Sequence, residues 1–362
     1  MENEEIKKTT RGKVDLESYM EAVISQDGSD LHLTVGSHPI IRATSELIPL
    51  VNEKILTQED MLLLVDSLMR PEQKENFLRD QEVDFSYSFK NKARFRGNGY
   101  VERGKIGIAL RLIPTYIRTL EELNLPPYLA SFADKRQGFF LVVGPVGQGK
   151  STTLASIVEL INQKQAKHII TIEDPIEYVF EEKKSIIAQR EVRVDTKDFP
   201  TALRAAFRQD VNVLMVGEMR ELETISTAVT AAETGHLVLS TLHTNNAAQT
   251  IDRIIDSFPS TQQDQIRLQL AASLAGIFSQ RLIPRIAGGL VPAYELLVNN
   301  SAVSNLIRER RTHEVNTIIE TSSEDGMIDM NRSLADLVRR GEITPEDAFR
   351  HSLNPQVLER LL

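Results

Sequence analysis

The clearest chemistry in the sequence lies in the run Gly144-Pro145-Val146-Gly147-Gln148-Gly149-Lys150-Ser151. Glycines at this spacing let successive backbone N–H groups converge on an anion without clashes from Cβ atoms. The pattern predicts that Lys150 reaches the β- and γ-phosphates of a nucleotide and that the Ser151 hydroxyl is a ligand for Mg²⁺. We therefore expect this run and the adjoining Thr152 to bind a nucleotide.

The elements around this run are those that a phosphate-binding loop requires. An apolar run at Phe139–Val143 predicts a strand, and Thr152–Asn162 predicts a helix. A helix that starts directly after the glycines adds the partial positive charge of its N-terminus to the loop. A chance match to the motif has a probability of roughly one in a hundred at average composition, and this context lowers it further.

Acidic side chains follow two further expected strands. The β-branched run His168–Ile172 leads into Glu173-Asp174-Pro175-Ile176-Glu177, and Val211–Val216 leads into Gly217-Glu218. In an open α/β sheet, ligands bind beyond the carboxyl ends of the strands. Glu218 matches the Walker B pattern, in which the carboxylate faces the Mg²⁺ held at Ser151. A carboxylate of the earlier group is a candidate to orient water, although a loop of solvated acids is the alternative.

A third expected strand, His236–Thr241, leads into a His-Thr-Asn cluster that begins with His243. Such a cluster at the edge of the sheet can sense a γ-phosphate through hydrogen bonds, and a structural histidine is the alternative. A helix expected at Asp198–Gln209 carries Arg204 and Arg208 one turn apart. Thr261–Gln280 is expected to form one long helix, followed by a short hairpin and further helices.

The first part of the chain predicts a small α+β domain at residues 14–113. Its expected elements are a helix at Val14–Ser25, a turn at Gly28–Asp30, a strand at Leu31–Val35, a capped helix after Thr57, and strands at Val83–Phe89, Ala93–Val101 and Lys105–Leu112. By pattern alone, Arg96 and Arg111 are solvated charges on the polar face of a half-exposed sheet. Prolines delimit a connection at residues 114–130, and residues 131–362 form the second domain.

Composition narrows the class of protein. The length of 362 residues favours two domains, and the absence of cysteine excludes disulfides, thiolate zinc sites and cysteine nucleophiles. The net charge of −9 argues against a nucleic-acid motor, although it does not exclude a local basic channel. Residues 1–13 predict a disordered tail with no secretory signal, and no apolar run approaches the roughly 20 residues that span a bilayer. We therefore expect membrane association only through a partner.

Four motifs resemble those of the secretion-superfamily ATPases in order and spacing. They are GPVGQGKSTT, ITIEDPIEYVF, AFRQDVNVLMVGEMR and TGHLVLSTLHTNNA, which correspond to the Walker A, Asp box, Walker B and His box. Outer segments look like the type IV pilus retraction ATPases, the PilT family: SDLHL at Ser29–Leu33, RLIPRIAGGLVPAYELL at Arg281–Leu297 and AVSNLIRE at Ala302–Glu309. The resemblance covers roughly residues 15–355.

This resemblance implies an α/β protein with a PAS-like N-terminal domain and a RecA-like P-loop ATPase domain that ends in a helical region. It implies a Mg²⁺-dependent ATPase that forms a homohexameric ring with ATP between subunits. Such rings lie in the cytoplasm against an inner-membrane platform protein and drive pilin removal from the pilus, and hence twitching motility. By the family pattern, Glu177 is the general base and Glu218 is the metal-binding acid. His243 is the His-box residue, with His236 nearby, and Arg96 and Arg111 are the arginines that contact phosphate groups.

Three alternatives remain beside pilus retraction: an extension or secretion ATPase of the same superfamily, an ATP-binding regulator that does not hydrolyse, and a nucleic-acid translocase. The absence of cysteine and the early start of the PAS-like domain favour retraction, because the extension relatives usually carry a tetracysteine zinc insertion and a longer N-terminal region. The presence of Glu177 and Glu218 argues against the regulator, and the acidic net charge argues against the translocase.

The sequence departs from the family pattern at a few positions. Val146 and Gln148 stand where the usual loop reads GPTGSGKST, and we expect the backbone cradle to survive while polar contacts of those side chains are lost. Val211-Asn212 replaces Pro-Asp, and Ser304 replaces an arginine in the AIRNLIRE motif. Because the last motif is associated with retraction, its change bears on how efficiently hydrolysis is coupled to movement.

Overall fold

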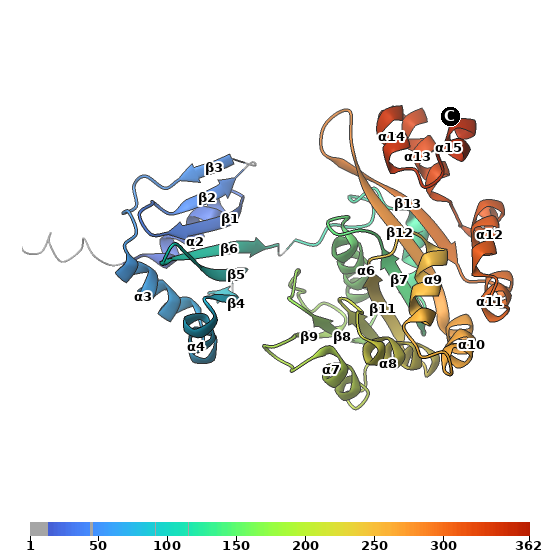
Figure 1. Ribbon diagram of the computed structural model, residues 1–362, viewed down its shortest axis with the longest axis horizontal. Coiled ribbons are helices and arrows are strands. Elements are labelled where there is room, and N and C mark those ends of the chain that lie inside the picture. Colours follow the sequence, from blue (N-terminus) through green and yellow to red (C-terminus); the bar gives the residue numbers. More distant parts are fainter. Residues whose placement is uncertain (1–13, 44–45, 91, 115) are drawn as a thin grey trace, which may run out of the picture. The chain divides into compact units, whose positions relative to one another are not determined.

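The computed structural model describes residues 14–43, 46–90, 92–114 and 116–362. Two compact units divide the chain: the first precedes Tyr116 and includes Glu177–Val179, and the second comprises Tyr116–Ile176 and Phe180–Leu362 (Figure 1). Each unit contains its own sheet, and the expected α/β class is confirmed. Within the described ranges, no helix is both long enough and apolar enough to cross a membrane.

The first unit is built on a six-stranded antiparallel sheet with the order β3-β2-β1-β6-β5-β4. Its strands are β1 (Gly28–Thr34), β2 (Ile40–Ala43), β3 (Glu46–Pro49), β4 (Glu82–Phe89), β5 (Ala93–Glu102) and β6 (Lys105–Ile113). Its helices are α2 (Leu16–Ser25), α3 (Gln58–Leu68) and α4 (Pro71–Asp80). The sequence missed β2 and β3, and the turn expected at Gly28–Asp30 is wrong because these residues begin β1.

Local sequence explains where the helices of this unit begin. Thr57 caps α3 through a reciprocal pair: Thr57 Oγ1 accepts from the Asp60 N–H, and an Asp60 oxygen accepts from the Thr57 N–H at 2.9 Å. Pro71 opens α4, where its missing N–H costs no helical hydrogen bond. Helix α2 buries Tyr19, Met20 and Val23, which the sequence places on one face.

The second unit contains a seven-stranded sheet with the order β13-β12-β7-β11-β10-β8-β9. Its strands are β7 (Gly138–Val143), β8 (His168–Glu173), β9 (Ile186–Glu191), β10 (Val213–Val216), β11 (Leu237–Leu242), β12 (Leu274–Pro284) and β13 (Leu290–Val298). All neighbours are parallel except β12 and β13, which are antiparallel. The carboxyl ends of β7, β8, β10 and β11 therefore lie along one edge of the sheet.

Helices pack on this sheet and extend beyond β13 (Figure 1). They are α5 (Ala130–Ala133), α6 (Lys150–Lys164), α7 (Phe199–Ala206), α8 (Leu222–Glu233), α9 (Ala247–Asp256), α10 (Gln263–Ser273), α11 (Ser301–Arg308), α12 (Val315–Thr321), α13 (Met330–Arg339), α14 (Pro345–His351) and α15 (Pro355–Leu361), with 3₁₀ turns at Pro127–Leu129, Thr312–Glu314 and Ser323–Asp325. One core joins the sheet to helices α7 to α12, and a smaller core lies between the β12–β13 hairpin and helices α13 to α15.

The long helix expected at Thr261–Gln280 is wrong. Helix α10 ends at Ser273, and β12 begins at Leu274. Strand β12 pairs with β7 at one edge and with β13 at the other, and the side chains on both of its faces are nearly all buried. A fully buried strand lacks the polar–apolar alternation that marks a half-exposed strand, and its apolar run then reads like a continuation of the preceding helix.

Candidate nucleotide-binding site

The P-loop (residues 144–151) joins the end of β7 to the start of α6, as the sequence predicts. Gly144 has φ +147°, and a Cβ atom there would lie 2.5 Å from the main-chain oxygen of Gln280. Gly149 is the N-cap of α6 and has φ +77°. Gly144 requires glycine because a side chain would combine a strained backbone with a clash, and the left-handed backbone at Gly149 disfavours any other residue. Because Gly149 caps α6, Lys150 and Ser151 form the first turn of the helix directly after the loop.

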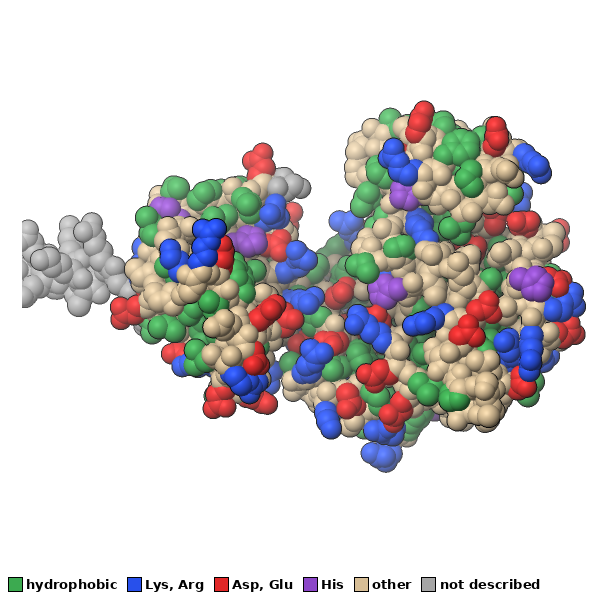
Figure 2. All heavy atoms as spheres, viewed as in Figure 1, with side chains coloured by type: hydrophobic (Ala, Val, Ile, Leu, Met, Phe, Trp, Pro, Cys, Tyr) green, Lys and Arg blue, Asp and Glu red, His purple; other side chains and the backbone are tan. Residues whose placement is uncertain are grey.

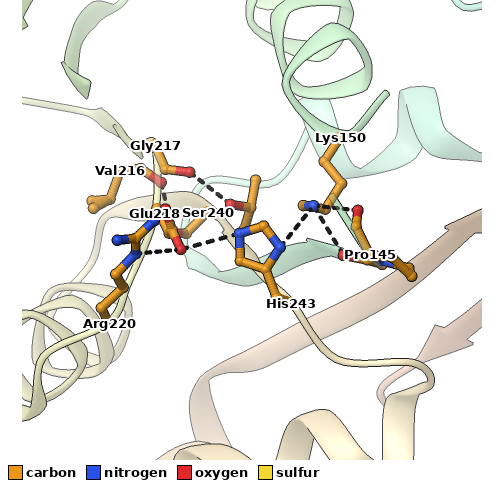
Figure 3. A network of polar contacts seen from close by, with 10 residues as sticks. Pro145, Lys150, Val216, Gly217, Glu218, Arg220, Ser240 and His243 are labelled. Carbon is orange, nitrogen blue, oxygen red and sulfur yellow. Dashed lines mark hydrogen bonds and ion pairs between the residues drawn. The ribbon is translucent and has the colours of Figure 1, made fainter. Parts of the chain in front are cut away.

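Lys150 is buried, and its ammonium group contacts its own loop. Lys150 Nζ donates to the carbonyl oxygens of Gly144 at 2.9 Å and Pro145 at 2.8 Å (Figure 3). It also lies 3.3 Å from His243 Nδ1. The ammonium group thus sits within the P-loop, where an incoming phosphate group would compete with the two carbonyl oxygens for its protons.

His243 links the P-loop lysine to the acid after β10. Its Nε2 lies 3.0 Å from Glu218 Oε1, while its Nδ1 faces Lys150 (Figure 3). Lysine is only a donor, so this arrangement fits a neutral imidazole that accepts at Nδ1 and donates from Nε2. The three predicted residues Lys150, His243 and Glu218, which follow three different strands, therefore form one continuous chain of polar contacts.

Two hydroxyl groups fix the relative positions of β10 and β11 at this edge. Ser240 Oγ donates to the Val216 carbonyl at 2.6 Å, and Thr241 Oγ1 donates to the Gly217 carbonyl at 2.7 Å. These bonds tie the residues just before Glu218 to those just before His243 (Figure 3). Sequence reasoning missed them, because a serine and a threonine inside an apolar strand give no signal of their partners.

Glu218 is suited to hold a metal ion. Burial raises its pKa, but the hydrogen bond and charge of Arg220, with the charge of Lys150, outweigh burial and lower the pKa below its usual value. Arg220 Nε donates to Glu218 Oε1 at 2.7 Å. The carboxylate is therefore ionised at neutral pH and provides the anionic oxygen that Mg²⁺ prefers.

The oxygen donors Ser151 and Glu218 fit Mg²⁺ bound together with a nucleotide. Mg²⁺ usually takes one or two protein oxygens and completes its shell with phosphate oxygens and water. In the part of the chain that the structure describes, no group of three or more His, Cys, Asp or Glu side chains is arranged to hold a metal ion. The two oxygen donors Ser151 and Glu218 thus match a Mg²⁺ ion that is bound as a complex with the nucleotide.

The remaining acids lie in the segment after β8. Glu173 is buried and accepts hydrogen bonds from Thr171 Oγ1 at 2.6 Å and from Gln189 Nε2 at 3.2 Å. Asp174 forms an ion pair with Arg193 at 3.5 Å. Glu177 groups with the first unit, so its predicted role as the water-orienting base stays a prediction.

Arg96 and Arg111 belong to the first unit and face each other directly across β5 and β6. Arg111 Nε donates to Asp30 Oδ1 at 2.8 Å, and Asp30 is its neighbour on β1. Burial raises the pKa of Asp30, but hydrogen bonds from Ser29 and Arg111 lower it overall, so Asp30 is ionised. Asp30 therefore compensates the charge of Arg111, while Arg96 stands directly opposite Arg111 on β5.

Three other predicted candidates lie away from the P-loop contacts. Arg204 pairs with Glu223 of α8, and Arg208 is exposed after the end of α7. His236 precedes β11, whereas His243 follows it, so their separation along the strand is about 20 Å. His236 Nδ1 lies 3.0 Å from the Ala231 carbonyl, which makes its role structural. His236 thus lies at the opposite end of β11 from His243, and its place among the site residues stays a prediction.

Gln148 contradicts the expectation that its polar contacts are lost. Gln148 Oε1 accepts from the Leu282 N–H of β12 at 2.7 Å, while Val146 is 80% exposed. Ser304, which replaces an arginine of the family pattern, donates to the Ala271 carbonyl at 2.9 Å and so ties α11 to α10. Gln148 and Ser304 therefore each make a local hydrogen bond within the second unit, whereas the apolar side chain of Val146 cannot.

A parallel sheet with a P-loop, an acid and a histidine at the carboxyl ends of its strands defines a RecA-like P-loop ATPase. The family described as "Type II/IV secretion system protein" matches residues 108–315, and the chain belongs to this family. The chain is 40% identical over 343 residues to "Type IV pilus retractation ATPase PilT" of Pseudomonas aeruginosa, covering 95% of this chain and 99% of that protein.

Two further relatives agree with this assignment. The chain is 44% identical over 320 residues to "Twitching motility protein" of Neisseria gonorrhoeae, covering 88% of this chain and 85% of that protein. A crystal structure of the pilus retraction motor PilT with bound ADP superposes with a TM-score of 0.90 at 46% identity, covering 96% of this chain and all of that chain. The resemblance to the PilT family is thereby confirmed, and the chain is an ATPase of this type.

Proposed function

We propose that this chain is the ATP-hydrolysing motor that retracts a type IV pilus and so drives twitching motility. The observation that carries the proposal is the chain of contacts Lys150–His243–Glu218, because it joins the P-loop to the proposed metal-binding acid. Relatives that are named for pilus retraction support the mechanical role. The chemistry is hydrolysis of ATP to ADP and phosphate, coupled to mechanical work.

In this proposal, different residues of the second unit bind the phosphates, hold the metal ion and detect the γ-phosphate. Backbone N–H groups of the P-loop hold the phosphates, and Lys150 exchanges its contacts with Gly144 and Pro145 for the β- and γ-phosphate oxygens. Ser151 and Glu218 hold Mg²⁺, which when bound neutralises developing charge on the phosphates. His243, already in contact with Lys150, detects the γ-phosphate by hydrogen bonding.

The family pattern supplies the remaining roles. Glu177 orients and deprotonates the attacking water, and Arg96 and Arg111 contact phosphate oxygens. The register that places Arg96 opposite Arg111 across β5 and β6 supports this role, because two neighbouring guanidinium groups can donate charge-assisted hydrogen bonds to one phosphate group. We propose a homohexamer that acts from the cytoplasm on an inner-membrane platform protein and through it on the pilus.

A surface feature supports a protein-coupled motor over a nucleic-acid translocase. On the face seen in Figure 2, Lys and Arg side chains are interspersed with Asp and Glu. Two residues of the basic run Arg308, Arg310 and Arg311 are compensated, since Arg310 pairs with Asp264 at 2.6 Å and Arg311 with Glu309 at 2.9 Å. Electrostatic attraction to a phosphate backbone requires uncompensated basic groups.

The test compares cells that carry the Lys150→Ala variant with cells that carry the wild-type gene. We expect abundant surface pili that no longer retract, and purified Lys150→Ala protein that releases no phosphate from ATP. Cells without pili would instead identify an assembly motor, and unchanged pili with normal retraction would refute the proposal. Stimulation of the wild-type ATPase by DNA would favour a translocase.

A further inference from the structure

The last residues of β12 contact both of the loops that build the site. In a strand, adjacent side chains point to opposite sides, so Ser279 and Arg281 share one side of β12 while Gln280 has the other. The first side faces the His-box loop (residues 243–246), and the second faces the P-loop and α6. One short strand segment therefore meets two catalytic loops through alternating side chains.

Gln280 is built into the P-loop. It is 3% exposed, and its amide Oε1 accepts from Thr153 Oγ1 at 2.7 Å. Its Nε2 donates to the main-chain carbonyl of Gln148 at 2.8 Å. The main-chain oxygen of Gln280 also approaches Gly144 so closely that a Cβ there would lie 2.5 Å away. Gln280 thus contacts the start of the P-loop, its end and the first turn of α6.

Arg281 is built into the His-box loop instead. It is 7% exposed, and Arg281 Nη2 donates to Asn245 Oδ1 at 2.9 Å and lies 3.4 Å from the Asn245 carbonyl. Ser279 Oγ donates to the same carbonyl at 2.8 Å. Asn245 is two residues beyond His243, whose ring joins Lys150 to Glu218. Contacts from β12 therefore fix the main chain that carries His243.

We propose that the adjacent residues Gln280 and Arg281 have separate positioning roles in ATP hydrolysis. Gln280 holds the P-loop in its phosphate-binding shape, and Arg281 holds the His-box loop so that His243 meets Lys150 and Glu218. The inference rests on the proposed ATPase activity and deepens it. Neighbouring positions on one strand should then affect different kinetic constants, since one loop binds phosphate and the other acts on the γ-phosphate.

The test uses two methionine variants of the full chain, which remove the polar groups but keep unbranched side chains. Gln280→Met should raise the Kd of a fluorescent ADP analogue about tenfold and change kcat less than twofold, as expected for loss of two buried hydrogen bonds to the P-loop. Arg281→Met should lower kcat about tenfold and leave that Kd within twofold. Arg281→Lys should recover part of kcat, because one donor can still reach Asn245.

Matched controls separate positioning from general loss of stability. One control is Gln263→Met, which removes a glutamine of α10 that donates to the Phe258 carbonyl at 3.2 Å. The other is Arg285→Met, which removes an arginine that forms an ion pair with Glu342 at 2.9 Å. Neither residue contacts the two loops, so both variants should keep wild-type Kd and kcat. A double-mutant cycle of Arg281→Met with Asn245→Ala should be non-additive in kcat, because the two residues act through one contact.

The proposal is overturned if Gln280→Met and Arg281→Met change the same constant, or if the effects of Arg281→Met and Asn245→Ala multiply. If Arg281→Met does not fold, Asn245→Ala and Ser279→Ala test the same loop and must lower kcat with Kd unchanged. If the wild-type chain binds the ADP analogue but does not hydrolyse ATP, the proposed function fails. The Kd of Gln280→Met then still decides the P-loop half of the inference.

Discussion

Glu295 gives the stability of the second unit a defined pH dependence. This glutamate on β13 is buried, and its Oε1 accepts from the Ala247 N–H at 2.7 Å. Burial raises its pKa from 4.5 to about 7, and nearby Asp329 adds to this effect. The bond from Ala247 and the charge of Arg281 act in the opposite direction without cancelling it.

The magnitude follows from the difference between the folded and unfolded pKa values. A carboxyl group with a raised folded pKa stabilises the fold fully below pH 4.5, and this contribution is lost as the pH rises toward about 7. Between pH 5 and pH 8 the loss amounts to about 2 to 3 kcal/mol. Glu295→Gln removes the titration and keeps a carbonyl oxygen for the Ala247 N–H.

The assay is urea unfolding of the wild type and Glu295→Gln between pH 5 and pH 8, followed by circular dichroism. We expect the free energy of unfolding of the variant, relative to wild type, to rise by about 2 to 3 kcal/mol across this range. Any constant cost of the new amide group cancels in that comparison. Glu320→Gln, at an exposed position of α12, is the matched control and should show no such rise. Parallel pH profiles for wild type and Glu295→Gln would refute the reasoning.

Three further predictions follow. Glu177→Gln should bind ATP within twofold of wild type and lose at least about a hundredfold in kcat, and near-normal hydrolysis would remove Glu177 from the catalytic role. Gly144→Ala should abolish binding of a fluorescent nucleotide, because its Cβ would meet the Gln280 carbonyl at 2.5 Å; a wild-type Kd would contradict this. Thr57→Ala should lower the free energy of unfolding of the first unit by about 1 kcal/mol, measured by urea unfolding, because it removes the acceptor of the Asp60 N–H. An unchanged free energy of unfolding would show that this cap does not stabilise α3.

The sequence predicted the centre of the site because its signals are local. The glycine spacing of the P-loop and the residues that follow β10 and β11 are each read within a short window. Parallel strands then bring Lys150, Glu218 and His243 to one edge of the sheet without further information. The capping box at Thr57 was predictable for the same reason, since its partner is three residues away.

Contacts between distant segments were not predictable in this way. The bond between Gln148 and β12 joins residues 134 positions apart, and only the register of the folded sheet brings them together. Burial on both faces concealed β12 within an expected helix, and its contacts with the two loops were therefore missed. His236 and His243 belong to one sequence motif but flank opposite ends of β11, because a strand separates its two ends by its full length. The roles of Glu177, Arg96 and Arg111 stay predictions.

The contacts of Lys150 with its own loop make the P-loop an internal competitor for the nucleotide. The Gly144 and Pro145 carbonyl oxygens are tethered to the lysine and so act at a high effective concentration, whereas ATP acts at its free concentration. Each nucleotide that binds must displace these oxygens from the ammonium group. The buried charge of Lys150 is thus satisfied within its own loop, and this internal contact lowers the net gain in free energy when a phosphate oxygen takes its place.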